Sequence, residues 1–142
     1  YAYNAGQYKE ALKAYSIVEQ RYQASTVAQQ VPKLKKELRE AIAYEAYEKG
    51  LALMDSAEVG NRAEFYEEAI NVFTGIVEEY EGTESALGAL SNMGVCLEGV
   101  GKWNEAVRVY DQVIEMYEKE EATRDAYQFA RSHRDWIIAS RL

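Results

Sequence analysis

Few residues in this sequence are of the types that build catalytic or metal centres. It contains one histidine, His133, and one cysteine, Cys96, which excludes a metal site made of several Cys and His ligands. The triplet His133-Arg134-Asp135 spells a kinase catalytic loop, but no glycine-rich phosphate loop or Asp-Phe-Gly sequence accompanies it. We therefore predict a non-enzymatic protein with no catalytic, cofactor-binding or metal-binding residues, and an inert, buried role for Cys96.

The composition favours a helical protein and argues against some classes of partner. The chain has 142 residues, a net charge of -8 and a single proline, and no Lys/Arg stripe follows any expected helix. This acidity argues against a nucleic-acid partner. No apolar run approaches the roughly 20 residues needed to cross a bilayer, so we expect no direct insertion into a membrane. We predict that more than about two-thirds of the residues are helical.

The segment 83–117 contains two amphipathic stretches separated by glycines. Apolar residues recur every three or four positions in both stretches, as they do on one face of a helix. These residues are Leu90, Met93 and Leu97, and then Trp103, Ala106, Val107, Tyr110, Val113, Ile114 and Tyr117. Gly99 and Gly101 interrupt the pattern between the two stretches, as a tight connection between helices requires. We therefore predict a helical hairpin in this segment.

Five positions of the second stretch occur three times in the chain. The first set is Trp103, Ala106, Tyr110, Val113 and Tyr117. The second set, 37 residues earlier, is Tyr66, Ala69, Phe73, Ile76 and Tyr80. The third set, a further 58 residues earlier, is Tyr8, Ala11, Tyr15, Val18 and Tyr22. The shared alanine indicates a place where two helices cross too closely for a larger side chain, so we interpret the pattern as an internal repeat of helical hairpins.

This repeat resembles the tetratricopeptide repeat. The residues that carry the resemblance are Leu90, Met93, Gly94, Leu97, Gly101, Trp103, Ala106 and Tyr110. The resemblance implies an all-α fold in which antiparallel helical hairpins stack as a right-handed superhelix. Two features depart from the usual repeat: the spacing is 37 residues, and Tyr80 and Tyr117 stand near the end of the second helix, where a proline is expected. The longer spacing with these tyrosines is similar to bacterial envelope members, such as outer-membrane assembly lipoproteins and Tol-associated periplasmic proteins. That similarity implies a place in the periplasm or cell envelope.

We expect residues 1–142 to form a single helical-repeat domain, as a fragment of a longer protein. Its predicted parts are a partial repeat 1–22, an extended repeat 33–80, a repeat 83–117 and a terminal or capping helix 122–141. In the partial repeat we expect a turn at Gly6, and between the first two repeats a turn over residues 23–26.

The extended repeat is longer than the others because its first helix is long. We predict this helix over 33–55, with Pro32 at or near its start, where the missing proline N–H costs nothing. Residues 56–62 are then expected to form a longer surface loop before the second helix.

The first helix of each hairpin would line one concave face of such a stack, and we predict that this face binds a peptide or helix of a protein partner. The predicted contact residues are Tyr47, Leu51, Met54, Ser91, Asn92, Val95, Gln128 and Phe129. Tyr44, Tyr47 and Phe129 lie outside the repeat positions and belong either to this face or to the core. Asn92 pairs either with a bound peptide backbone or with the neighbouring hairpin.

Self-assembly is the alternative function for a protein of this kind. In this case the edges of the stack would join copies of the chain into homo-oligomers. Solution mass measured against protein concentration would distinguish self-assembly from binding to a different partner.

Overall fold

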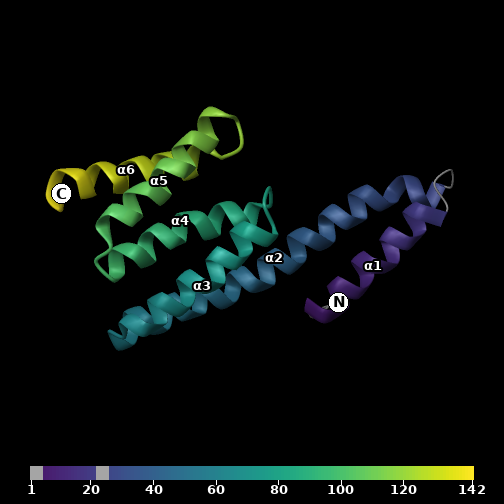
Figure 1. Cartoon of the computed structure of the whole chain (residues 1–142), viewed down its shortest axis with the longest axis horizontal. Coiled ribbons are helices and arrows are strands. Elements are labelled where there is room, and N and C mark those ends of the chain that lie inside the picture. The colour runs from purple at the N-terminus through teal and green to yellow at the C-terminus, as the bar shows by residue number, and fades with distance from the viewer. Residues whose placement is uncertain (1–4, 22–25) are drawn as a thin grey trace. The chain divides into compact units, whose positions relative to one another are not determined.

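The computed structural model describes residues 5–21 and 26–142, and the described residues are almost entirely helical (Figure 1). The helices are α1 (Ala5–Arg21), α2 (Thr26–Gly60), α3 (Ala63–Glu79), α4 (Glu84–Gly99), α5 (Trp103–Glu118) and α6 (Arg124–Ser140). They account for 88% of the described residues, with no strand among them, which confirms the predicted all-α fold. None of these helices is long and apolar enough to cross a membrane.

The chain divides into two compact units, Tyr1–Glu45 and Ala46–Leu142, and α2 passes from the first into the second. In the first unit, the Nζ of Lys35 in α2 forms an ion pair with Oε1 of Glu19 in α1 at 2.8 Å. The side chains of Val31, Ile42 and Ala43 are buried in this part of α2. The predicted repeat residues of α1 are less well covered, since Tyr8, Ala11, Tyr15 and Val18 are only half-buried.

The start of α2 differs from its prediction. Pro32, expected near the first residue, lies inside the helix, which begins six positions earlier at Thr26. An internal proline loses one backbone hydrogen bond and costs roughly 3 kcal/mol. Val31 beside it is fully buried, and burying such a side chain contributes about 1.5–3 kcal/mol. Packing of Val31 therefore offsets much of the local cost of Pro32.

The end of α2 also differs, because the loop predicted over 56–62 is wrong. The helix continues through the buried Ala57 to Gly60, and only Asn61 and Arg62 connect it to α3. Asn61 has a positive φ of 50°, and the N–H of Arg62 donates to the carbonyl of Ala57 at 3.0 Å. A left-handed residue followed by this hydrogen bond closes a helix C-terminus.

The predicted turn at Gly6 is likewise wrong, since Gly6 lies in the first turn of α1. A glycine is tolerated there because the first N–H groups of a helix have no partner within it. Of the turn predicted over residues 23–26, residues 23–25 lie outside the described residues, and Thr26 is the first residue of α2.

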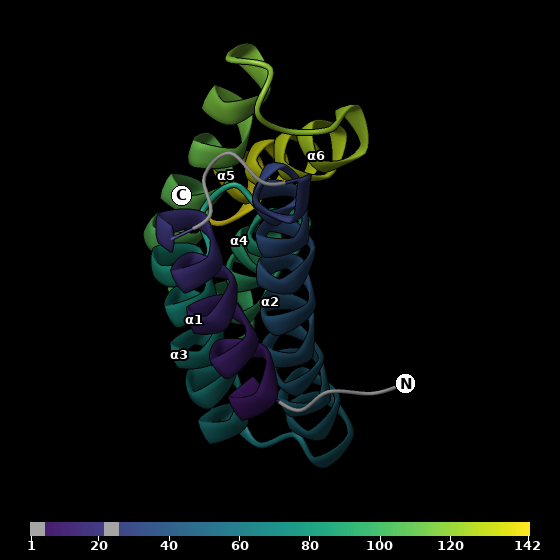
Figure 2. The same ribbon diagram turned by 90° about the vertical axis from the view of Figure 1, so that its right-hand side faces the viewer.

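In the second unit, consecutive helices pack against each other, and α4 also contacts α6 (Figures 1 and 2). Helix α3 corresponds to the second helix of the extended repeat, α4 and α5 form the predicted hairpin, and α6 follows as the last helix. The middle repeat positions of α3 and α5 form the core, whereas the outer positions Tyr66, Trp103 and Tyr117 are only half-buried. The fully or almost fully buried side chains are Ala69, Phe73 and Ile76 in α3 and Ala106, Tyr110 and Val113 in α5.

In each hairpin, one glycine allows the two helices to approach closely. A Cβ atom added at Gly50 of α2 would overlap the ring of Phe73 in α3, and one added at Gly94 of α4 would overlap the ring of Tyr110 in α5. Both rings are fully buried, so neither has free space into which it could move. We call this arrangement the glycine–aromatic contact. It occurs once in each hairpin, where a glycine of the first helix packs on an aromatic ring of the second.

Candidate peptide-binding face

The predicted contact residues lie on α2 and α4, the first helices of the two hairpins, and on α6, the next helix in the stack. None of the eight is buried. We call the surface that they occupy the first-helix face, and it comprises Tyr47, Leu51 and Met54 of α2, Ser91, Asn92 and Val95 of α4, and Gln128 and Phe129 of α6. Leu51, Met54 and Val95 are half-exposed, and Gln128 is exposed. Its character is thus mainly apolar and aromatic with a few polar groups.

A hydrogen bond joins α2 to α4 on this face. Nδ2 of Asn92 donates to the hydroxyl oxygen of Tyr47 at 2.8 Å and to the carbonyl of Gly88 at 3.0 Å. A side chain at Gly88 would crowd the Tyr47 hydroxyl, so the glycine leaves room for this bond. The Tyr47 ring also packs on Phe73, with ring centroids 5.8 Å apart. Asn92 therefore bonds to the neighbouring hairpin, one of its two predicted roles, and it fixes the position of Tyr47.

A comparison with protein families finds a match that covers the α4–α5 hairpin. A family model described as tetratricopeptide repeat matches residues 89–124, from the second turn of α4 through α5 to the first residue of α6. This match supports the tetratricopeptide-repeat family. Repeats of this family generally mediate protein–protein interactions, and the family is one of non-enzymatic scaffolds. No curated protein matches the chain.

A second polar connection lies between α4 and α6, and the sequence analysis did not predict it. Nδ1 of His133 lies 2.7 Å from Oε2 of Glu98, and the hydroxyl of Tyr110 donates to the same carboxylate oxygen. Burial and the neighbouring Glu98 carboxylate raise the pKa of Tyr110 well above its ordinary value, so the hydroxyl keeps its proton. Glu98, Tyr110 and His133 thus join three helices through one carboxylate.

Phe129 sits on this polar cluster. Its ring centroid lies 4.2 Å from that of His133 and 6.2 Å from that of Tyr110. Even so, 37% of Phe129 remains accessible to solvent, so the ring is supported by the cluster and still partly available at the surface. Ser91, by contrast, donates its hydroxyl to the carbonyl of Leu87 in its own helix at 3.2 Å.

Neither Cys96 nor the triplet at residues 133–135 is arranged for a reaction. Burial raises the pKa of the Cys96 thiol to about 12, and a protonated thiol is a poor nucleophile. The histidine that could activate it is engaged with Glu98. Arg134 forms ion pairs with Asp111 at 3.2 Å and with Asp135 at 3.0 Å.

One sequence signal could have identified the missed cluster. Glu98 is the only acidic residue in the last two turns of α4, and His133 is the only histidine in the chain. Both lie on first helices that contact each other in a stack of hairpins. A sole acid and a sole histidine on facing helices form a candidate pair.

Proposed function

We propose that the chain is a non-enzymatic scaffold that binds an extended peptide or a helix of a protein partner on the first-helix face. The observation that carries this proposal is the pair of polar connections across the face. Tyr47–Asn92 joins α2 to α4, and Glu98–His133 joins α4 to α6. Both pairs use side chains to hold neighbouring first helices together. A surface held in one geometry before binding loses less entropy when a partner docks.

The exposed groups of the face have the chemistry of a peptide-binding surface. Tyr47 and Phe129 offer large aromatic rings, which are the side chains that most often dominate binding energy. Leu51, Met54 and Val95 contribute apolar area between them. The amide of Gln128 and the side-chain oxygen of Asn92, which accepts no hydrogen bond from the described residues, are available to pair with a peptide backbone. In a stack of hairpins such a face is concave.

The structure changes the role that we assign to Asn92. Because its two N–H donors are bound inside the protein, we expect it mainly to position Tyr47, and Asn92→Ala should lower both stability and binding. Phe129 is a better probe of the face, since its ring is partly exposed and lies at the edge of the core.

The test is to select binders from a displayed library of random peptides with the whole chain as the target. Affinities of the selected peptides are then measured by fluorescence polarisation for the native chain and for Phe129→Ala. We expect Phe129→Ala to weaken binding about tenfold, as the loss of an aromatic hot spot does. Ile138→Ala is the matched control, because Ile138 is 49% exposed and lies on the opposite side of α6, and it should change affinity less than about twofold.

Retained binding by Phe129→Ala would contradict the assignment of the face, provided that circular dichroism shows a folded variant. A solution mass that rises with protein concentration and falls back in Phe129→Ala would favour the self-assembly alternative, in which a second copy covers this face. We infer a place in the bacterial cell envelope from the longer repeat with a tyrosine near the end of its second helix, and localisation of the tagged protein tests it.

A further inference from the structure

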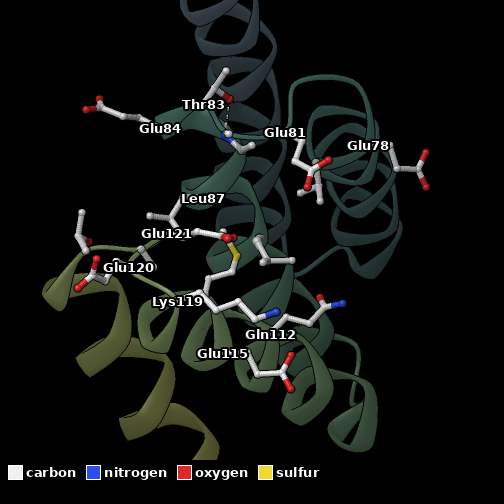
Figure 3. Close-up of a pocket in the computed structure, with 17 residues that line it drawn as sticks. Glu78, Glu81, Thr83, Glu84, Leu87, Gln112, Glu115, Lys119, Glu120 and Glu121 are labelled. Atoms are coloured by element: carbon white, nitrogen blue, oxygen red, sulfur yellow. Dashed lines mark hydrogen bonds between the residues drawn. The ribbon is translucent and has the colours of Figure 1, made fainter.

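A second concave surface, which shares no lining residue with the first-helix face, lies between the loop that joins α3 to α4 and the loop that joins α5 to α6. It is a cavity of about 970 Å³, at the upper end of the range for ligand pockets, and it is formed by the end of α3, the start of α4, the end of α5 and the loop before α6. We call it the inter-loop cavity. Figure 3 shows Leu87 and Glu121 near its centre, whereas Glu84 and Glu78 project outward at opposite sides.

The floor of the inter-loop cavity is apolar and is attached to the core. Val77, Leu87 and Met116 line it, and all three pack against the buried core cluster that contains Tyr110 and Ile137. They are half-buried, so they keep apolar area in contact with water. A partner side chain that covered this area would gain the free energy of apolar burial, about 25 cal/mol for each Å² removed from water.

The rim of the inter-loop cavity is strongly acidic. Six glutamates and one lysine line the cavity, and they are Glu78, Glu81, Glu84, Glu115, Glu120, Glu121 and Lys119. All seven are exposed. Glu78, Glu115 and Glu121 form no ion pair with any residue that the structure describes. Lys119 offsets only one of the six carboxylate charges, so the rim keeps a negative potential that favours cations and disfavours anionic partners.

Two helix caps hold this rim in position. Oγ1 of Thr83 accepts a hydrogen bond from the N–H of Ala86 at 3.1 Å, which fixes the start of α4. The N–H of Glu121 donates to the carbonyl of Met116 at 2.7 Å and closes the end of α5. Glutamates on both sides of the cavity are thus carried by ends of helices that are bonded in place, so the acidic rim exists before a partner arrives.

We propose that the inter-loop cavity is a second docking site, whose occupant is a partner peptide with a large apolar side chain flanked by lysine or arginine. The apolar side chain fits the floor of Val77, Leu87 and Met116, and the flanking cations pair with the rim. A polyamine or a metal ion would leave the apolar floor uncovered, and an acidic or purely apolar segment would have to pass the carboxylates without compensation. This proposal does not depend on the first-helix face.

The test uses the whole chain and three short fluorescein-labelled peptides. The first has central leucine and methionine flanked by lysine and arginine, the second replaces the basic residues with glutamate, and the third replaces the apolar residues with serine. We expect the first to bind at least about tenfold more tightly than the other two, since it alone has both features. Its affinity should also fall as salt is added, because exposed charges are screened.

Charge substitutions at the rim test whether the first peptide binds in the inter-loop cavity. Glu115→Gln combined with Glu121→Gln should weaken the first peptide on the order of fivefold, whereas Lys119→Gln should strengthen its binding about twofold. The matched control combines Glu58→Gln with Glu68→Gln, because both glutamates are exposed and lie outside the cavity. This control makes the same change in net charge and should alter affinity less than about 1.5-fold.

Several results would overturn the proposal. Equal binding of the first and third peptides, or equal losses in the rim variant and the control variant, would mean that net charge alone attracts the peptide. A solution mass that rises with concentration and drops in the rim variant would mean that a second copy occupies the cavity, with its own basic residues 33–39 as the candidate segment. Amide shifts in a heteronuclear NMR titration should centre on Leu87 and Met116, and shifts centred elsewhere would contradict the site.

Discussion

Both hairpins, α2–α3 and α4–α5, contain a glycine packed on an aromatic ring, but only the ring of α4–α5 carries a hydroxyl group. In the first, Gly50 faces the ring of Phe73, and in the second, Gly94 faces the ring of Tyr110. Phe73 packs only through its ring, against Tyr47, whereas the Tyr110 hydroxyl donates to Glu98. That carboxylate in turn pairs with His133 of α6. The shared glycine and ring thus close each hairpin, and the added hydroxyl attaches the second hairpin to the next helix.

The largest expected effect comes from filling the glycine positions. Gly94→Ala and Gly50→Ala each force a Cβ atom against a buried ring, and overpacking of this kind costs about 1–3 kcal/mol. This cost should exceed the roughly 1 kcal/mol that alanine gains over glycine inside a helix. We therefore expect both variants to have a lower urea midpoint than the native chain.

Gly75 provides the control for these two substitutions. It lies in α3, and a Cβ atom there would meet no atom within 4 Å. Gly75→Ala should therefore keep the helix-propensity gain and raise the midpoint. A gain in all three variants would show that the glycines of the two hairpins are not close-packed.

Tyr110→Phe sharpens the comparison by giving the second hairpin the aromatic residue of the first. The variant keeps the ring but removes the hydrogen bond to Glu98, and we expect a loss of about 0.5–1.5 kcal/mol in the free energy of unfolding. Tyr117→Phe is the matched control, because the Tyr117 ring stacks on Tyr127 and its hydroxyl has no hydrogen-bond partner among the described residues. Equal midpoints for the two variants would remove the proposed role of the hydroxyl.

A smaller effect on the free energy of unfolding should appear at alkaline pH, and it comes from two groups of the α4–α5 hairpin. Cys96 has a pKa raised to about 12 by burial, and the pKa of Tyr110 is raised by burial and by Glu98. Above about pH 9 the unfolded chain begins to lose these protons while the folded chain retains them. The folded state then binds more protons, so its stability falls as the pH rises from about 9 to 12.

Urea midpoints measured between neutral pH and pH 11 test this expectation. The combined variant Cys96→Ala and Tyr110→Phe should show a shallower decline above pH 9 than the native chain, whatever its stability at neutral pH. An unchanged slope would mean that neither group holds its proton in the folded state.

The sequence was sufficient to predict the repeating core, because its signal is local and periodic. Ala69, Phe73, Ala106 and Tyr110 were found from spacing alone, and all four are fully buried. The start of α2 was predicted wrongly because a local signal in the sequence was overridden by tertiary packing. Pro32 is a strong local signal against a helix interior, but packing of the adjacent Val31 overrides it.

The polar connections of the first-helix face depend on the fold. Asn92 and Tyr47 are 45 residues apart in the sequence, and His133 and Glu98 are 35 apart. Pattern analysis placed Tyr47 and Asn92 on the face but did not pair them, and it interpreted His133 only as part of a chance triplet. Pairing such residues requires knowing which helices are neighbours, and the periodicity within one helix does not show this.

The central claim is that both hairpins are copies of one unit built on the glycine–aromatic contact, and a pair of double-mutant cycles tests it directly. Free energies of unfolding are measured for Gly94→Ala with and without Tyr110→Leu, and for Gly50→Ala with and without Phe73→Leu. We predict that each alanine costs at least about 1 kcal/mol less when its ring has been replaced, because residues in contact are energetically coupled. An alanine cost that is the same with and without the ring, in either hairpin, would contradict the claim.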